Sequence, residues 1–163
     1  MPARYSDEEI AEMIQEPKRL PDSCYSQFHS QIQMYNKRGH KEQELDVKGE
    51  HGRQYRLILR QSNLNSLDFS IILALVPHDS SQLFRLCRYN GKSHAHTNQI
   101  ERVTFYDFHI HKATERYQDL GYREDAFAEP TDRYADFYTD LICLLKDYNF
   151  VMPKYLQRRL WEG

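Results

Sequence analysis

The sequence predicts an α+β fold: an antiparallel sheet of about five strands, a short N-terminal helix and a C-terminal helix that covers the sheet. Between residues 40 and 111, runs rich in β-branched and aromatic residues alternate with turn signals, which is typical of consecutive strands. The last third changes to apolar residues at spacings of three and four, which is typical of an amphipathic helix. Strands followed by helices indicate an α+β domain.

The first element is a short helix in the segment SDEEIAEMI. Ser6 is followed three residues later by Glu9, which is the pattern of a capping box, and Ile10 and Met13 recur at helical spacing. Pro17 ends the pattern. Up to residue 52 the chain is then polar and only weakly periodic.

Strands are expected over residues 54–61, 68–76, 83–89 and 103–111, all in one sheet. The first of them pairs with the preceding segment QELDVK across the turn GEHG, as a hairpin. The second contains the apolar run IILALV, which indicates a buried strand. The dipeptide Asn90-Gly91 marks a turn after the third strand.

A covering helix is expected to begin near Thr131, directly after Pro130. Its apolar residues recur every three or four positions: Tyr134, Tyr138, Leu141, Leu145 and Tyr148. A further short helix is expected after Pro153, because proline suits the first position of a helix.

Size and charge limit the class of protein. A chain of 163 residues fits a single domain over residues 1–163. Its 22 Lys and Arg against 24 Asp and Glu leave no overall basic excess to hold a nucleic-acid duplex, although a local basic patch is compatible with these numbers. The acidic N-terminus and the short longest apolar run, at residues 71–76, predict a soluble cytoplasmic protein without a membrane partner.

The three cysteines, Cys24, Cys87 and Cys143, are an odd number without C-x-x-C spacing. This pattern favours reduced thiols that pack in the protein over a disulfide framework or a zinc ribbon.

Histidines are concentrated in one region, since four of the eight lie between His94 and His111 as two H-x-H pairs. Alternation along a strand places His109 and His111 on one face, with Phe108 and Ile110 on the core face. Two residues of extended chain span roughly 6.5 Å, from which two imidazole rings can converge on one ion or small anion.

Three interpretations of these histidines are open. In the first they form the polar side of a half-covered strand. In the second, His109 and His111 bind a divalent metal with a third ligand from His94, His96 or Glu115, although a lone H-x-H does not define such a site.

The third interpretation is a metal-free site for phosphate chemistry, and it sets the predicted roles. His109 and His111 act as base and acid, because the unperturbed pKa of histidine is about 6.5. Arg116 holds the anionic charge, because a guanidinium can donate two hydrogen bonds to phosphate. Residues predicted to bind the substrate or to assist Arg116 are His94, His96, Tyr117, Arg85, Arg88 and Arg102. Simple structural roles compete with these: an ion pair of Arg116 with an Asp or Glu such as Asp119, and packing for Tyr117.

Two consequences follow for the folded protein. No Cys or His cluster has the closed four-ligand spacing of structural zinc, so we expect no cofactor and no metal requirement for folding. His109→Ala is expected to leave stability nearly intact, because Phe108 and Ile110 carry the burial on the opposite face.

Three segments together resemble a known family: FRLCRYNGKSHAHTNQIE, FHIHKATERYQ and AEPTDRY. The chain is similar over about residues 53–150 to a family of small uncharacterised bacterial proteins, known only as a domain of unknown function. The resemblance implies a bacterial, intracellular protein and carries no reaction, substrate or cofactor. Residues 1–52, the N-terminal helix and polar segment, are less similar.

The function predicted from the residues is therefore a polar, His- and Arg-rich site that binds or cleaves RNA or a nucleotide phosphate. The alternative belongs to another class. It is a non-enzymatic accessory protein that contacts a protein partner through its tyrosine-rich last third, for which the aromatic content of 13% would supply the surface. The two differ in whether the clustered histidines and Arg116 meet in one pocket.

Overall fold

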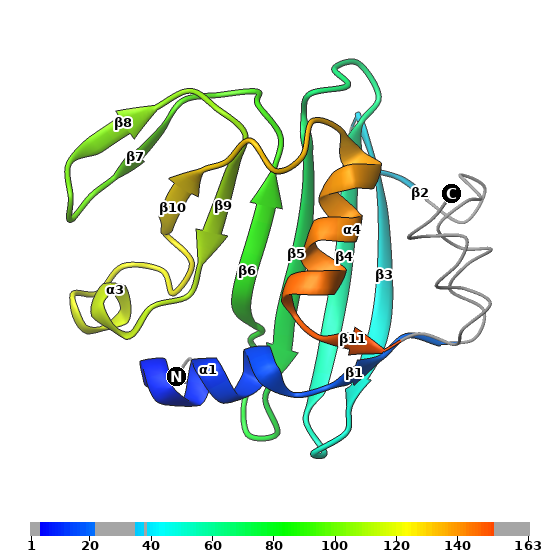
Figure 1. The fold of residues 1–163 in the computed structure, drawn as a ribbon, viewed down its shortest axis with the longest axis vertical. Helices are drawn as coiled ribbons and strands as arrows, with labels where there is room; N and C mark the ends of the chain where they lie inside the picture. The colour runs from blue at the N-terminus through cyan, green and yellow to red at the C-terminus, as the bar shows by residue number, and fades with distance from the viewer. Residues whose placement is uncertain (1–3, 22–34, 38, 152–163) are drawn as a thin grey trace.

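The computed structural model describes residues 4–21, 35–37 and 39–151, and this part of the chain is mostly β-sheet (Figure 1). It contains the helices α1 (Asp7–Gln15), α3 (Glu115–Asp119) and α4 (Phe137–Asp147). In chain order the strands are β1 (Lys18–Arg19), β2 (Tyr35–Lys37), β3 (His40–Gly49), β4 (Gln54–Ser62), β5 (Phe69–Val76), β6 (Phe84–Asn90), β7 (His96–Asn98), β8 (Val103–Phe105), β9 (His109–Lys112), β10 (Phe127–Pro130) and β11 (Phe150–Val151).

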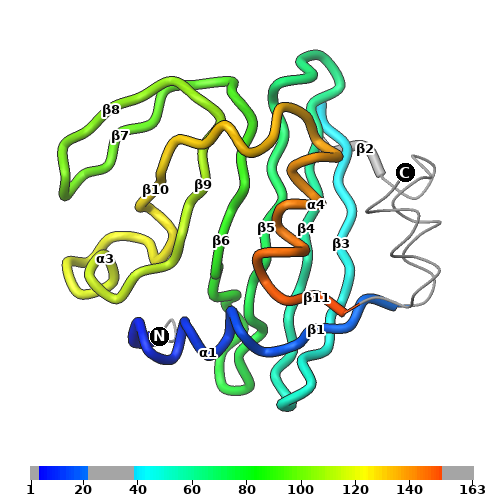
Figure 2. The backbone as a smooth tube through the Cα atoms, viewed as in Figure 1, coloured from blue at the N-terminus to red at the C-terminus, as the bar shows by residue number. Residues whose placement is uncertain are grey.

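One curled sheet dominates the fold (Figure 2). Its strands follow the order β10-β9-β6-β5-β4-β3-β1-β11, with β2 also paired to β3, while β7 and β8 form a separate two-stranded sheet. The predicted five-strand α+β fold is therefore wrong. The sheet is larger because the short strands β1, β10 and β11 extend its two edges, and strands of two to four residues leave no periodic pattern in the sequence.

The central strands agree with the sequence, and the last predicted strand does not. β4, β5 and β6 match the predicted ranges to within a residue or two, and β3 and β4 form the expected hairpin. The range 103–111 was predicted as one strand and is two. β8 pairs only with β7, whereas β9 pairs with β6 and β10, so the chain leaves one sheet and enters the other between residues 105 and 109.

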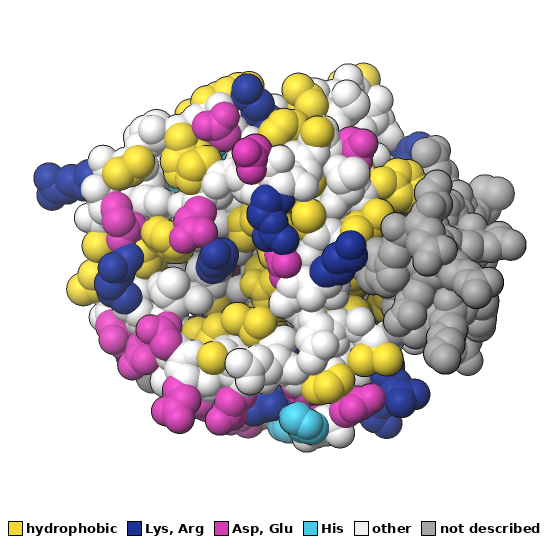
Figure 3. All heavy atoms as spheres, in the orientation of Figure 1, with side chains coloured by type: hydrophobic (Ala, Val, Ile, Leu, Met, Phe, Trp, Pro, Cys, Tyr) yellow, Lys and Arg dark blue, Asp and Glu magenta, His cyan; other side chains and the backbone are white. Residues whose placement is uncertain are grey.

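The main hydrophobic core lies on the face of the sheet that α1 and α4 cover (Figure 1). Alternate residues of the central strands, such as Leu57, Leu59, Ile71 and Leu73, are fully or almost fully buried there. Around the helices the outer surface of this side mixes acidic, basic and apolar side chains (Figure 3). In the part of the chain that the structure describes, no helix is long and apolar enough to cross a membrane.

Both main helices begin with a capping box. At α1 the predicted pair is confirmed, because Ser6 accepts a hydrogen bond from Glu9 N–H and the Glu9 carboxylate accepts one from Ser6 N–H. α4 begins after Asp136, not near Thr131 as predicted. Thr131 instead donates its backbone N–H to the Phe108 carbonyl, so it continues the extended segment of β10.

Two smaller predictions have mixed outcomes. Cys87 is a free, buried thiol of the core and Cys143 is a free thiol packed against it, as expected of packing residues. Cys24 and the helix predicted after Pro153 lie outside the described residues.

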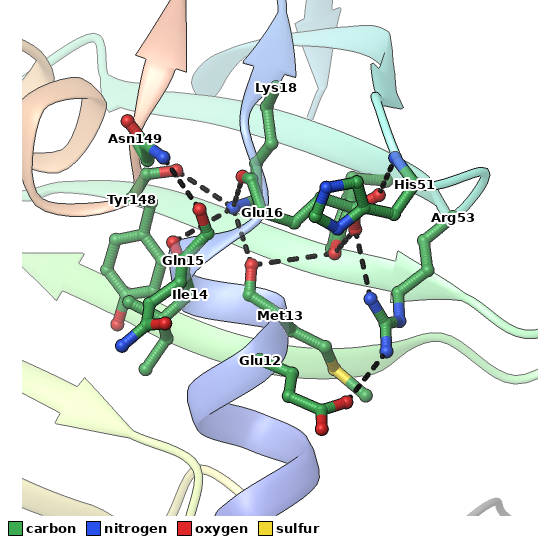
Figure 4. A network of polar contacts seen from close by, with 11 residues as sticks. Glu12, Met13, Ile14, Gln15, Glu16, Lys18, His51, Arg53, Tyr148 and Asn149 are labelled. Atoms are coloured by element: carbon green, nitrogen blue, oxygen red, sulfur yellow. Dashed lines mark hydrogen bonds and ion pairs between the residues drawn. The ribbon is translucent and has the colours of Figure 1, made fainter.

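A buried lysine joins the ends of α1 and α4 to the sheet edge (Figure 4). Lys18 is fully buried, and its ammonium donates to the carbonyls of Met13, Glu16 and Tyr148 at 2.6, 2.9 and 2.8 Å, with Ile14 at 3.3 Å. These carbonyls lie at the C-terminal ends of the two helices, where partners within the helix are missing. Burial lowers the pKa of Lys18 to about 8, so the ammonium still predominates at neutral pH.

The neighbouring Glu16 is buried with an equally complete set of partners (Figure 4). Its carboxylate accepts hydrogen bonds from the Tyr55 hydroxyl, from His51 N–H at 2.6 Å and from Arg53 at 3.4 Å. Burial alone would raise the pKa of Glu16, but these hydrogen bonds outweigh it and the pKa lies below its ordinary value. Glu16 and Lys18 together fix the junction of α1 with the β3–β4 turn.

Lys18→Met should destabilise the protein by at least about 3 kcal/mol, because buried carbonyls at two helix ends would lose their donor. Urea denaturation measures this change. Arg19→Met is the matched control, because its side chain is 71% exposed and the change should stay within about 0.5 kcal/mol. Equal losses in the two variants would contradict the capping role of Lys18.

A buried acid makes stability depend on pH. Asp140 of α4 is fully buried, and neither of its carboxylate oxygens has a hydrogen-bond partner among the described residues. Burial, with a smaller contribution from Asp136, raises its pKa well above the ordinary value. The unfolded chain therefore releases this proton at lower pH than the folded chain, and stability falls as pH rises from the ordinary pKa of 3.8 toward the folded one.

Asp140→Asn should flatten this part of the stability–pH profile and raise stability at pH 7. Denaturation curves recorded at several pH values test it, with Asp46→Asn as control because that side chain is 84% exposed. An Asp140→Asn profile that keeps the wild-type slope would show that another group causes the dependence.

Candidate metal centre

The histidines of β9 lie on the face of the sheet opposite the main core. Ile110 and its partner Tyr89 on β6 point into the core, so His109 and His111 on either side of Ile110 point away from it. The prediction that His109 and His111 lie on the face opposite the core is thus confirmed. The prediction that they are exposed to solvent there is wrong, because His109 is 0% and His111 3% exposed. The expectation that His109→Ala would leave stability nearly intact no longer follows.

The β7–β8 hairpin is anchored beside this face through a buried asparagine. Asn98 donates its side-chain amide to the Ala128 carbonyl at 2.8 Å and accepts the Ala128 N–H at 2.9 Å. These two bonds attach β7 to β10, the strand next to β9. The hairpin therefore brings His96, at the start of β7, against the two histidines of β9.

The four clustered histidines do meet in space, which the sequence left open. The ring centroid of His96 lies 5.6 Å from that of His109 and 4.7 Å from that of His111, and the latter two are 5.1 Å apart. His94 is exposed, and its ring lies 5.9 Å from that of His109. One ring nitrogen from each of His96, His109 and His111 falls within 4.8 Å of the other two, and this group is the three-histidine cluster discussed below.

Hydrogen bonds fix the tautomer of each ring in the three-histidine cluster. Nδ1 of His109 lies 2.8 Å from the Asp107 carbonyl, and Nδ1 of His111 lies 2.8 Å from the Asp125 carbonyl. A carbonyl can only accept, so both Nδ1 atoms carry the proton and both Nε2 atoms keep a lone pair.

His96 follows the same rule through its other nitrogen. Its Nε2 lies 2.9 Å from Asn98 Oδ1, whose identity is fixed because the same oxygen accepts Ala128 N–H. Nε2 of His96 therefore donates, and Nδ1 keeps the lone pair. Metal-binding histidines characteristically donate their second ring N–H to a carbonyl or another fixed acceptor in this way.

The surroundings keep the two buried rings neutral. Burial is the main cause that lowers the pKa of His109 and lowers that of His111 to about 2, and the nearby Arg88 guanidinium adds to both. Neutral imidazole is the form that binds metal.

The spacing of the three-histidine cluster is close to that of a transition-metal site. A tetrahedral zinc ion with Zn–N bonds of about 2.0–2.1 Å holds its nitrogen ligands roughly 3.4 Å apart. Small rotations of the rings would close the remaining distance, and half-buried His96 has the most room to move. Three protein ligands with an open position are characteristic of catalytic zinc rather than structural zinc.

Arg116, Tyr117 and Glu115 serve other contacts. Arg116 of α3 is paired with Glu101 at the tip of the β7–β8 hairpin, not with Asp119, and its side chain is 57% exposed. Tyr117 is fully buried and donates its hydroxyl to the same Glu101 at 2.6 Å, as a packing residue would. Glu115 contacts Asp7 at the start of α1.

A polar cleft of about 230 Å³ adjoins the three-histidine cluster. Arg88 and Asn90 of β6 line it, and in the strand pairing they lie directly opposite His111 and His109. The cleft continues across β5 and β4 to Ser70 and Arg60.

Sequence reasoning named Arg88 but missed the two asparagines. Asn90 was interpreted as a turn residue, yet it ends β6 with its amide 3.4 Å from Nε2 of His109. Asn98 was used only as part of the segment that resembles the bacterial family, and no role was predicted for it. The spacing H-x-N in HTN could have indicated it, because side chains two apart on a strand share one face.

Asn98→Ala should cost about 2–4 kcal/mol, since a buried N–H and C=O of Ala128 would lose their partners, and it should also release His96. Urea denaturation measures the first effect, and NMR of the imidazole nitrogens the second. Thr97→Ala is the matched control on the same strand, because Thr97 is exposed and its hydroxyl bonds that of Thr104 across the hairpin. If both variants were equally stable, Asn98 would not be the anchor.

Comparisons with protein-family models, with curated proteins and with solved structures find no match to this chain, so the resemblance to a bacterial family of unknown function stays a prediction.

Proposed function

We propose that this protein binds one divalent transition-metal ion of the zinc type through His96, His109 and His111 and uses it to hydrolyse an ester. The observation that carries the proposal is that one ring nitrogen from each of the three histidines lies within 4.8 Å of the other two. In addition, one nitrogen of each ring donates to a fixed acceptor and the other keeps a lone pair. When bound at such a site, the ion polarises a substrate oxygen and lowers the pKa of coordinated water to about 7.

The protein's own residues would hold and shield this centre. The Asp107 and Asp125 carbonyls orient the rings of β9, and Asn98 orients His96. His109 and His111 are almost fully buried, which strengthens electrostatic interactions inside the site. The Asn90 amide donates toward Nε2 of His109 at 3.4 Å, a contact that a metal ion bound to that nitrogen would replace.

The other interpretations of the histidines have less support. A metal-free acid–base pair needs one histidine in the protonated form, and burial lowers the pKa of both His109 and His111. An accessory protein would use tyrosines of the last third as a contact surface, yet Tyr117, Tyr134 and Tyr148 are buried, and among the described residues there Tyr122 and Tyr138 are exposed. A cytoplasmic location remains our proposal, supported by the free thiols Cys87 and Cys143.

The first test is metal binding by the full chain, stripped with a chelator and titrated with Co²⁺ or Zn²⁺. Wild type should bind one equivalent, with the absorption of tetrahedral Co²⁺, and His96→Ala should bind at least about tenfold more weakly because one of three ligands is lost. His96 is the variant of choice, since it is only half buried.

His78→Ala is the control, because His78 is an exposed histidine on the β5–β6 loop. Wild type that binds no ion, or a His96→Ala variant that binds as tightly as His78→Ala, would refute the metal site.

Chelation should leave the protein folded, because the main core is hydrophobic and lies on the other face of the sheet. Zinc at a hundredfold excess over its dissociation constant should add about 2.7 kcal/mol and raise the Tm of wild type by roughly 5–10 °C. At the same concentration His96→Ala should gain at most about 1.4 kcal/mol, because its site is at least tenfold weaker. Thermal unfolding with EDTA or zinc measures both. If the protein unfolded in EDTA, the metal ion would instead be required for folding.

A further inference from the structure

The polar cleft beside the three-histidine cluster follows one row of paired residues across the sheet. Arg60 of β4 lies opposite Ser70 of β5, Ser70 opposite Asn90 of β6, and Asn90 opposite His109 of β9. Adjacent strands are about 4.8 Å apart, so this row runs roughly 14 Å from Arg60 to His109. The Arg60 guanidinium lies at the β3 end of this row, beside His40, and lines the same cleft as Arg88 and Asn90.

Two arginines give the cleft donors for an anion. The Arg60 guanidinium is 44% exposed, donates to His40 at 3.2 Å and forms an ion pair with Glu42 at 4.0 Å. A guanidinium has five N–H donors, so most of those on Arg60 can serve a ligand.

Arg88 is the more buried of the two arginines. Its Nε lies 3.5 Å from Asp125 and has no hydrogen-bond partner among the described residues. Burial lowers the pKa of Arg88, Asp125 raises it, and the nearby arginines Arg123 and Arg60 lower it by smaller amounts, so charges of both signs surround this guanidinium.

The remaining polar groups favour an anion that also carries hydroxyl groups. The acidic residue that lines the cleft is Asp68, whose carboxylate accepts a hydrogen bond from the Ser93 hydroxyl at 3.4 Å. A carboxylate repels bare phosphate but accepts hydrogen bonds from hydroxyls, and a ribose phosphate offers both groups. Ser70 donates to Asn90 at 2.7 Å, which directs the Asn90 amide toward His109.

We propose that this cleft binds the phosphate of a ribonucleotide, free or within RNA, through Arg60 and Arg88, and presents its ester bond to the three-histidine cluster. The chemical step rests on the proposed metal function, whereas phosphate binding does not. In that step the oxygen of one water bonds to phosphorus, the ester P–O bond breaks, and the proton of the water passes to the leaving oxygen.

Binding is tested on metal-free protein, so that its outcome is independent of the metal site. Adenosine 5′-monophosphate should bind wild type measurably in calorimetry, adenosine should not, and Arg60→Gln should weaken binding at least about tenfold. Arg56→Gln is the matched control. Arg56 lies on the same strand and the same face, is paired with Asp46 at 3.4 Å, and is outside the cleft, so its removal should change affinity less than twofold.

A parallel titration with a short single-stranded RNA separates the two sources of phosphate. Affinity at least tenfold above that of the mononucleotide, with the same dependence on Arg60, would assign RNA, and equal affinity would assign the free nucleotide. If wild type bound no nucleotide, or if Arg60→Gln and Arg56→Gln lost affinity equally, the proposal that this cleft binds phosphate would be wrong. Binding without hydrolysis in the presence of zinc would leave the cleft standing and overturn the proposed chemistry.

Discussion

The pairing of β6 with β9 is the constraint on which both the core and the candidate site depend. In this register Tyr89 faces Ile110 in the core, while Asn90 and Arg88 face His109 and His111 on the other side. A slip by one residue would exchange the two faces, burying imidazoles among leucines and exposing Ile110. The free energy of apolar burial on one face therefore fixes the positions of the polar groups on the other, without any contribution from the histidines themselves.

A second constraint converts that polar face into an enclosed site. Residues 99–102, between β7 and β8, close a small hairpin that could have extended away from the sheet. Asn98 prevents this, because its amide replaces the ladder hydrogen bonds that β10 would otherwise make with another strand. The Asn98 side chain thus attaches β7 to β10, sets the tautomer of His96 and holds the His96 ring where it stacks on that of His109. Asn98 therefore matters to the candidate site as well as to the stability of the fold.

What the sequence could predict was local. The capping box of Ser6 and Glu9 and the apolar alternation of β4 to β6 depend on neighbours within a few residues, and the structure agrees with them. Lys18 pairs with Phe150 across more than a hundred residues, and no local pattern indicates a two-residue strand. The same limit applies to the histidines.

The histidine site could be predicted only in part. The H-x-H spacing correctly placed His109 and His111 on one face, but their burial depends on a hairpin whose anchor, Asn98, is an ordinary polar residue in the sequence. Arg116 was associated with the site because it is near in sequence. The turn before α3 directs it toward Glu101, whereas Arg60, almost fifty residues before His109, is carried toward the cleft by the strand pairing.

The charges around the site connect its two proposed ligands. Asp125 is a buried carboxylate 3.5 Å from Arg88 and 3.8 Å from Arg123, so it offsets one of two positive charges. A divalent ion on the neighbouring rings would add two more, in a region where burial makes uncompensated charge expensive. A phosphate between Arg60 and Arg88 would supply the missing negative charge. The proposed ion and the proposed substrate should therefore favour each other's binding, and the cleft should attract phosphate more strongly once the histidines hold a metal.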